Sequence, residues 1–150
     1  MSTARTPYQD TSVPVERSKE QIRQALKDAG ARGVQFDEMW EPETLYVVRF
    51  LWAMGEGFDA TVRVRLEVKP LPPVENTRSG WSISPEQRER QAWRALAWYM
   101  KTMLEAASFG LMRFEDVFLS FVEGEDGRTI GEAVIPMLES GRLALPKGGS

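Results

Sequence analysis

Three arginines on two adjacent predicted strands form the first candidate binding site. Arg63 and Arg65 alternate with apolar residues, so they share the polar face of one strand. Arg49 lies in the preceding strand with the parity that places it on the same face. Guanidinium groups on an exposed sheet can each hold a phosphate through two hydrogen bonds. The alternative is a solvated face on which these arginines pair with Asp59 and Glu67.

A second basic stripe is predicted on a long helix. At about 100° per residue, Arg90, Arg94 and Lys101 lie within about 40° of one another, and Trp98 lies beside them. Cationic side chains next to an aromatic ring suit single-stranded nucleic acid, because bases stack on the ring while phosphates pair with the charges. The alternative is a charged helix flank that includes Glu105.

Glu67 and Lys69, at the end of a predicted strand, could take part in metal-dependent hydrolysis. In an antiparallel hairpin Glu43 would lie opposite Lys69, and two carboxylates with a lysine could bind Mg²⁺ and activate water. The order helix, strand, strand, strand, helix resembles the restriction-like nuclease core. The Asp expected before the hairpin is missing, and Glu-x-Lys is common on polar strand faces, so this is the third hypothesis.

Other catalytic patterns are absent from the sequence. The acidic run 123–127 lacks the spacing of an EF-hand, and we interpret it as a solvated turn. There is no glycine-rich phosphate loop and no nucleophile-elbow serine. The chain has no Cys and no His, which removes thiolate chemistry, the commonest general base and the commonest metal ligand. We therefore expect no cofactor, no metal and no catalytic residue.

Composition places the chain among ordinary globular domains. It has 150 residues, of which 42% are apolar and 27% charged. The net charge of -3 argues against a non-specific nucleic-acid binder, although a local basic patch is compatible with it. No apolar run approaches the roughly 18 residues of a membrane helix, and the first ten residues lack a signal core, so we expect a cytoplasmic protein. Few thermolabile residues and many arginines fit a thermophilic source or a GC-rich genome.

Helix signals and strand periodicity define the first half of the chain. A helix is predicted over residues 19–29, with a capping box of Ser18 and Gln21 and a stop at Gly30. Strands are predicted near residues 33–40, 45–53 and 58–68, and alternation in the last two predicts one buried face.

The second half is predicted to be mainly helical. Residues 70–83 hold three prolines and read as a loop excursion. Ser84 and Gln87 begin a helix that runs to about Phe109, and a shorter helix covers 114–121. The core stripe predicted on the long helix consists of Trp93, Leu96, Met100, Met103, Leu104 and Ala107. A third capping box, Thr129 with Glu132, begins a last helix that Pro136 can kink.

These elements predict an α+β fold. A three- to four-stranded antiparallel sheet carries two main helices on its apolar face, with short C-terminal helices added. The single domain spans 13–140, between a flexible arm at 1–12 and a flexible tail at 141–150. The other face of the sheet is expected to meet solvent or a partner.

Three stretches of the sequence resemble a family of small proteins of unknown function from bacteriophages and bacterial genomes. They are residues 12–31 (beginning SVPVERS), residues 90–106 (beginning RQAWRAL) and residues 114–129 (beginning FEDVFL). The resemblance implies a phage-type accessory protein, which would act in the host cytoplasm, but it implies no particular activity. Glu67 and Lys69 depart from the family pattern, whereas Arg90, Arg94 and Lys101 fit it.

The sequence therefore favours a non-enzymatic binding module. Binding of single-stranded nucleic acid through the two arginine-bearing surfaces is the first hypothesis. The alternative is a protein-interaction or self-assembly module, including a homo-oligomer, because Trp, Tyr, Met and Arg are typical interface residues. Arginines merging into one groove would favour nucleic acid, and an exposed apolar patch would favour a protein partner.

Overall fold

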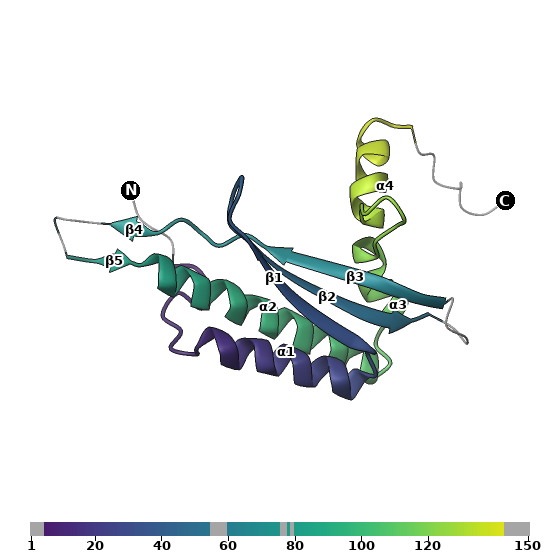
Figure 1. Cartoon of the computed structure of the whole chain (residues 1–150), viewed down its shortest axis with the longest axis horizontal. Coiled ribbons are helices and arrows are strands. Elements are labelled where there is room, and N and C mark those ends of the chain that lie inside the picture. Colours follow the sequence, from purple (N-terminus) through teal and green to yellow (C-terminus); the bar gives the residue numbers. More distant parts are fainter. Residues whose placement is uncertain (1–4, 55–59, 76–77, 79, 143–150) are drawn as a thin grey trace.

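The computed structural model describes residues 5–54, 60–75, 78 and 80–142 (Figure 1). The fold is α+β, as predicted, with a three-stranded antiparallel sheet in the order β1-β2-β3. Its elements are α1 (Val15–Ala29), β1 (Gly33–Met39), β2 (Leu45–Ala53), β3 (Thr61–Val68), β4 (Val74–Glu75), β5 (Ser82–Ile83), α2 (Pro85–Ser108), α3 (Phe114–Phe118), the 3₁₀ helix η2 (Leu119–Phe121) and α4 (Ile130–Glu139).

The two long helices α1 and α2 cover one face of the sheet (Figure 1). Trp93 of α2 lies against the rings of Phe36 and Tyr46, with ring centroids 5.7 and 5.5 Å away. The predicted helix stripe from Trp93 to Leu104 is buried, together with Val64 and Leu66 of β3. The apolar periods of helix and strand therefore meet in one core, as the sequence predicts.

Strand register confirms the parity expected for the polar face. Arg49 lies opposite Arg65 on β3 and Gln35 on β1. Its neighbour Phe50 lies opposite Val34 and Val64 and faces the helices. Because side chains alternate along a strand, the arginines project from the face opposite the helices.

The C-terminal segment wraps around the outer edge of β3. Phe118 of α3 packs against Phe50 on the helix-covered face, with centroids 5.5 Å apart. Val122 then forms a bridge with Val64 at the strand edge, and the Glu123 N–H donates to the Arg63 carbonyl at 2.8 Å. Figure 1 shows α4 beyond this edge, on the side of the sheet away from α1 and α2. The polar face is thus partly covered, whereas the sequence predicted an open one.

Two predicted capping boxes differ from the structure, and of the two helix starts only that of α1 was wrong. Helix α1 begins at Val15 directly after Pro14, so Ser18 lies inside the helix, buried against the core, and the predicted capping box is wrong. Ser84 does cap α2 by accepting from the Gln87 N–H, but the Gln87 amide group turns elsewhere. The capping box of Thr129 and Glu132 is confirmed, and Pro136 lies within α4.

Three predicted boundaries are also refined. The predicted loop 70–83 contains the short antiparallel pair β4–β5, in which Val74 faces Ile83. The predicted helix 114–121 is α-helical only to Phe118 and then tightens into η2. The predicted start of the third strand at Phe58 and most of the predicted tail lie outside the described residues.

Candidate interaction surfaces

Arg49, Arg63 and Arg65 lie together on the polar face of the sheet, but each of them is paired with at least one carboxylate. Arg49 pairs with Asp37 and, through Nε at 3.1 Å, with Glu123. Arg65 pairs with Glu132 and lies 3.5 Å from Glu123. The third arginine, at position 63, is more exposed and reaches the same Glu123 carboxylate at 3.7 Å.

Glu123 is the centre of this ion-pair network. Its side chain is only 8% exposed, and it contacts all three arginines. Three guanidinium groups face three carboxylates, so their formal charges cancel. Asp59, which was predicted as a partner, lies outside the described residues, and the carboxylates of the network come from β1, the 123–129 turn and α4. The arrangement fastens the C-terminal segment to the sheet and leaves little free positive charge for a phosphate.

The Glu132 carboxylate shows the electrostatic consequence. The backbone N–H of Thr129 lowers the pKa of Glu132 below its ordinary value, and Arg65 acts in the same direction. Because Glu132 also completes the capping box, one carboxylate both caps α4 and pairs with the sheet.

The basic stripe predicted on the long helix, which is α2, is only partly available to bind a ligand. Arg90 donates through two nitrogens to the Gln87 side-chain oxygen, at 3.0 and 2.7 Å. Arg94 donates to Gln21 of α1. Trp98, by contrast, is 52% exposed, and Lys101 is exposed beside it.

Arg94, Trp98 and Lys101 line a groove of about 480 Å³ between α1 and α2. Arg90 does not line it. The same groove is lined by the carboxylates of Asp28 and Glu105, so its charge is mixed. The two basic surfaces do not merge into one groove, because the first lies on the polar face of the sheet and the second on the outer side of the helices.

Two glutamines of α2 hold the N-terminal arm, which sequence reasoning missed. The Gln87 amide nitrogen donates to the carbonyls of Gln9 and Thr11, at 3.0 and 2.8 Å. One turn later, the Gln91 amide donates to Thr6 and Pro7, both at 2.8 Å. The described part of the predicted flexible arm is therefore hydrogen-bonded to α2.

Two arginines orient these glutamines. Arg90 donates to the Gln87 oxygen, and Arg88 donates to the Gln91 oxygen at 2.8 Å, which turns both amide NH₂ groups toward the arm. Arg90 thus has a structural role that its place on a charged flank did not indicate. The pattern Q-R-E-R-Q, with glutamines at positions i and i+4, is the only sequence signal for this ladder.

The residues of the nuclease hypothesis pair with each other. Lys69 forms an ion pair with Glu43 at 2.5 Å. The predicted register was wrong, because Tyr46 lies opposite Val68 and Glu43 is therefore not directly opposite Lys69. Both side chains are exposed. Throughout the part of the chain that the structure describes, no group of three acidic side chains is placed to hold a metal ion.

The pKa values of the buried Tyr46 and of the half-buried Glu89 on α2 are both raised. Burial raises the pKa of Tyr46 to about 12, and Glu89 and Glu38 add to the shift. Burial and the charge of Glu38 raise the pKa of Glu89, while Lys19 opposes them. Burial first, and repulsion among acids second, explain these shifts without a bound substrate.

Exposed apolar side chains gather where α2 ends. Phe109 and Leu111 are 82% and 76% exposed, and Met112 follows them. Gly110, with φ of +75°, turns the chain between them. We call Phe109, Leu111 and Met112 the end patch.

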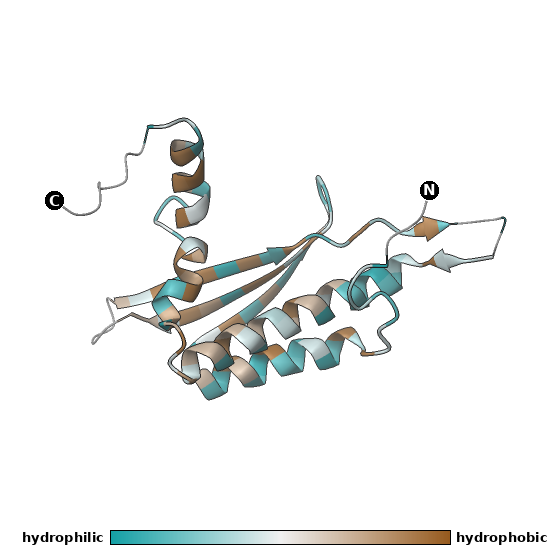
Figure 2. Ribbon diagram, turned by 180° about the vertical axis from the view of Figure 1, so that it is seen from behind, coloured by the Kyte–Doolittle hydropathy of each residue, from teal (hydrophilic) through white to brown (hydrophobic). Residues whose placement is uncertain are grey.

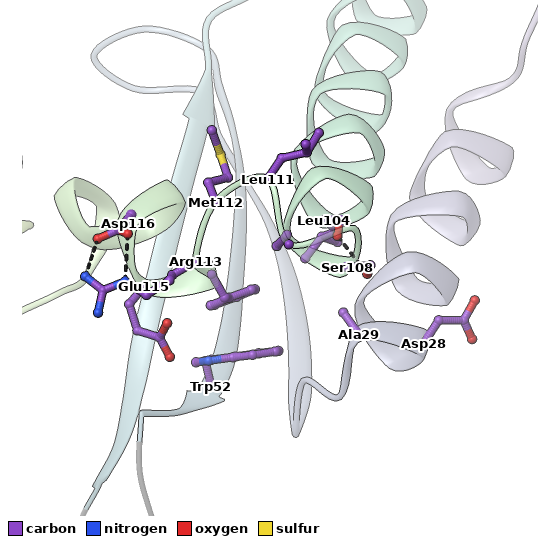
Figure 3. A pocket seen from close by; sticks show the side chains of 13 residues that line it. Asp28, Ala29, Trp52, Leu104, Ser108, Leu111, Met112, Arg113, Glu115 and Asp116 are labelled. Carbon is purple, nitrogen blue, oxygen red and sulfur yellow. Dashed lines mark hydrogen bonds and ion pairs between the residues drawn. The ribbon is translucent and has the colours of Figure 1, made fainter.

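Leu111 and Met112 of the end patch line a cleft of about 670 Å³ (Figure 3). Trp52 also lines it and is stacked on Phe114 with ring centroids 3.4 Å apart. Asp28 and Glu115 lie on opposite sides of the opening. Arg113, also at the opening, is bonded to Asp116. The lining of the cleft therefore combines apolar side chains with charged ones.

A second apolar surface covers α4. Gly131 is its buried residue, and a Cβ there would meet the Ser120 carbonyl oxygen at 3.0 Å. All residues from 135 to 142 are exposed. Figure 2 shows α4 as a projecting helix with a strongly hydrophobic surface. We define the α4 patch as Leu119, Ile130, Ile135, Met137 and Leu138.

Comparisons with known proteins give no relative. No family model matches the chain, and neither does any curated protein or solved structure. The resemblance to phage proteins therefore stays a prediction. No helix in the described ranges is long and apolar enough to cross a membrane.

Proposed function

We propose that this protein is a non-enzymatic protein-interaction module that binds through its C-terminal third. One observation carries the proposal: eight of the fourteen large apolar side chains exposed in the described residues lie between residues 109 and 138. They form the end patch and the α4 patch. Scattered apolar side chains are normal on a protein surface, whereas a concentration of them in one region indicates an interaction site.

Electrostatics supports this choice over nucleic-acid binding as the leading function. The arginines of the sheet are neutralised by three carboxylates. Arg90 and Arg94 already donate to glutamines. A nucleic-acid surface needs cations that can exchange counterions for phosphates, whereas most of these cations have protein partners.

Site-specific photo-crosslinking in the source cells tests the proposal. A benzophenone amino acid at Leu138 or Phe109 should give discrete adducts whose second component mass spectrometry identifies. Leu71 is the matched control position, since it is 42% exposed, close to the 44% of Leu138, and lies outside both patches. Adducts that form equally from Leu71, or no adduct from either patch, would contradict the proposal.

Single-stranded nucleic acid is the second candidate, favoured by the exposed Trp98 beside Lys101 and Arg94. A base stacked on Trp98 would contribute about 1–3 kcal/mol to binding. Replacing Arg94 and Lys101 together with Ala should flatten the salt dependence of a gel shift by up to about two units. Trp98→Ala should weaken the same shift. A wild-type protein that shifts no DNA or RNA at low salt eliminates this candidate.

A further inference from the structure

We infer that a cleft between the end of β3 and the start of α2 binds a small organic carboxylate, which pairs with Arg88. The cleft has a volume of about 450 Å³, and its lining comes from the beginning of β2, the segment that follows β3 and the first turn of α2. Figures 1 and 2 both place the end of β3 and the start of α2 at the end of the sheet away from α4. The inference is therefore independent of the protein interaction proposed above.

The charge of Arg88 is not compensated by a described residue. Arg88 is buried, with only 7% of its surface exposed. Its Nε donates to the Pro72 carbonyl at 2.9 Å and its Nη1 to the Gln91 side-chain oxygen at 2.8 Å, and both acceptors are neutral. In the part of the chain that the structure describes, Arg88 forms no ion pair with a carboxylate. A charge that is removed from water without being paired is costly, so this position favours an anion.

Arg88 also has unused hydrogen-bond donors. A guanidinium group carries five N–H donors, and the two bonds above leave Nη2 without a partner among the described residues. Thr44 and Tyr46, which line the same cleft, each carry a hydroxyl group. The pKa of Tyr46 is raised to about 12, so its hydroxyl stays protonated near neutral pH and can donate. A carboxylate, which only accepts hydrogen bonds, is complementary to these donors.

The charged part of the cleft lining is entirely cationic. It consists of Arg88 and Lys69, and no carboxylate contributes to it. Four other clefts in the described residues are each lined by at least one carboxylate. Glu86 and Glu89 of α2 line the separate cleft beside the N-terminal arm, and Glu38 of β1 is exposed and does not line this cleft either. An anion in the cleft would therefore contact cationic side chains and not acidic ones.

The balance of charge favours a ligand with one negative charge. Lys69 is paired with Glu43 at 2.5 Å, so Arg88 supplies the one positive charge of the lining that no described carboxylate neutralises. Glu38 and Glu89, which raise the pKa of the phenol in the cleft, would repel a second negative charge. A carboxylate carries one negative charge, whereas a phosphate monoester carries about −1.5 to −2 near neutral pH. The cleft therefore fits a carboxylate better than a phosphate.

Much of the remaining lining is apolar. It includes Leu71 and the prolines at positions 70, 72, 73 and 85. Because the proline ring fixes φ, this wall has little conformational freedom to lose when a ligand binds. Small-molecule sites typically have volumes of about 300–1,000 Å³ and a mostly apolar lining with a few polar groups. The ligand is therefore a carboxylate on an apolar body, such as an aromatic ring.

Isothermal titration calorimetry with benzoate, phenyl phosphate and benzyl alcohol tests the inference. Wild-type protein should bind benzoate more tightly than phenyl phosphate, and at least about tenfold more tightly than the neutral benzyl alcohol. Arg88→Gln should weaken benzoate binding at least about tenfold, because it removes the unpaired charge. Arg94→Gln is the matched control, since it makes the same change on the same helix but outside this cleft, and it should leave benzoate binding unchanged.

Glu43→Gln tests the charge balance without altering Arg88. It leaves Lys69 unpaired, so binding of phenyl phosphate should tighten about threefold or more. Glu41→Gln is the same change at another exposed position of the same turn, and it should have no effect. Circular dichroism checks that each variant is folded, and if Arg88→Gln is unfolded, the comparison of Glu43→Gln with Glu41→Gln decides.

Four outcomes would overturn the inference. They are no binding of benzoate to the wild type at millimolar concentration, equal binding of benzyl alcohol, tighter binding of phenyl phosphate than of benzoate to the wild type, and unchanged benzoate binding in a folded Arg88→Gln variant. None of them bears on the proposed protein interaction, which photo-crosslinking tests separately.

Discussion

Glu123 accepts a hydrogen bond from Nε of Arg49 at 3.1 Å, across 74 residues of sequence. This contact joins the polar face of the central strand β2 to the turn that precedes α4. Arg65, opposite Arg49 in register, uses the same carboxylate. The nearly buried Glu123 therefore helps to fix the position of α4 relative to the sheet, together with the Arg65–Glu132 ion pair.

We expect Glu123→Ala to destabilise the fold. Removing one partner of a buried ion pair costs about 3–5 kcal/mol, and the partial exposure of both arginines reduces our expectation to roughly 1–3 kcal/mol. Glu123→Gln should cost less, because an amide oxygen still accepts from Arg49. Urea denaturation measures both variants. A loss below about 0.5 kcal/mol for Glu123→Ala would show that the network does not fasten the C-terminal segment.

Leu96→Ala should be a cavity mutant. Leu96 is buried in the core between α2 and the sheet, so truncation should cost about 2–5 kcal/mol. Leu111→Ala is the control of the same residue type on the surface, and it should change monomer stability by less than about 0.5 kcal/mol. Thermal unfolding at a concentration where the protein is monomeric compares the two. Equal losses would contradict the assignment of core and surface.

Gln91→Ala should release the N-terminal arm. Its amide contacts with Thr6 and Pro7 would be lost, and the Arg88 group bonded to its oxygen would lose a partner. Trypsin should then cut after Arg5 several times faster than in the wild type. Gln24→Ala removes a glutamine whose amide bonds only to Asp28 on the surface of α1, and it should leave the rate unchanged. An unchanged rate in Gln91→Ala would mean that the glutamine ladder does not hold the arm.

The cap of α4 should make stability depend on pH in a defined direction. The Thr129 N–H lowers the pKa of Glu132 in the folded state below its model-compound value of 4.5. A carboxyl group whose pKa is lower in the folded than in the unfolded state stabilises the fold at pH values above its unfolded-state pKa. This contribution is lost as the pH falls through its folded-state pKa. The stability difference between wild type and Glu132→Gln should therefore be largest near neutral pH and shrink below about pH 4.5. A constant difference from about pH 7 to pH 3 would contradict this role for the Glu132 charge.

Local pattern was enough to predict the main helices and strands and the face that their central residues occupy. Apolar alternation fixed the register parity that places Arg49, Arg63 and Arg65 on one side of the sheet. The 3.6-residue period placed Trp93 and Leu96 in the core and Trp98 on the surface. Thr129 and Glu132 capped a helix because both partners lie within four residues. The predicted start of α1 was wrong because a serine such as Ser18 can either cap the N-terminus of a helix or pack as a small buried residue inside it.

Only the tertiary structure decided what these residues do. The same exposed strand face could present free arginines or paired ones, and the outcome depended on Glu123 returning from the far end of the chain. Likewise, the sequence predicts Arg90 to be an unpaired cation on the flank of the helix. In the structure Arg90 donates to the Gln87 side-chain oxygen, and the Gln87 amide donates to the N-terminal arm. Periodicity is set by neighbours a few residues apart, so a sequence reveals it. Charge pairing and the exposure of α4 are determined by contacts between segments that are distant in sequence, and these contacts form only when the chain folds.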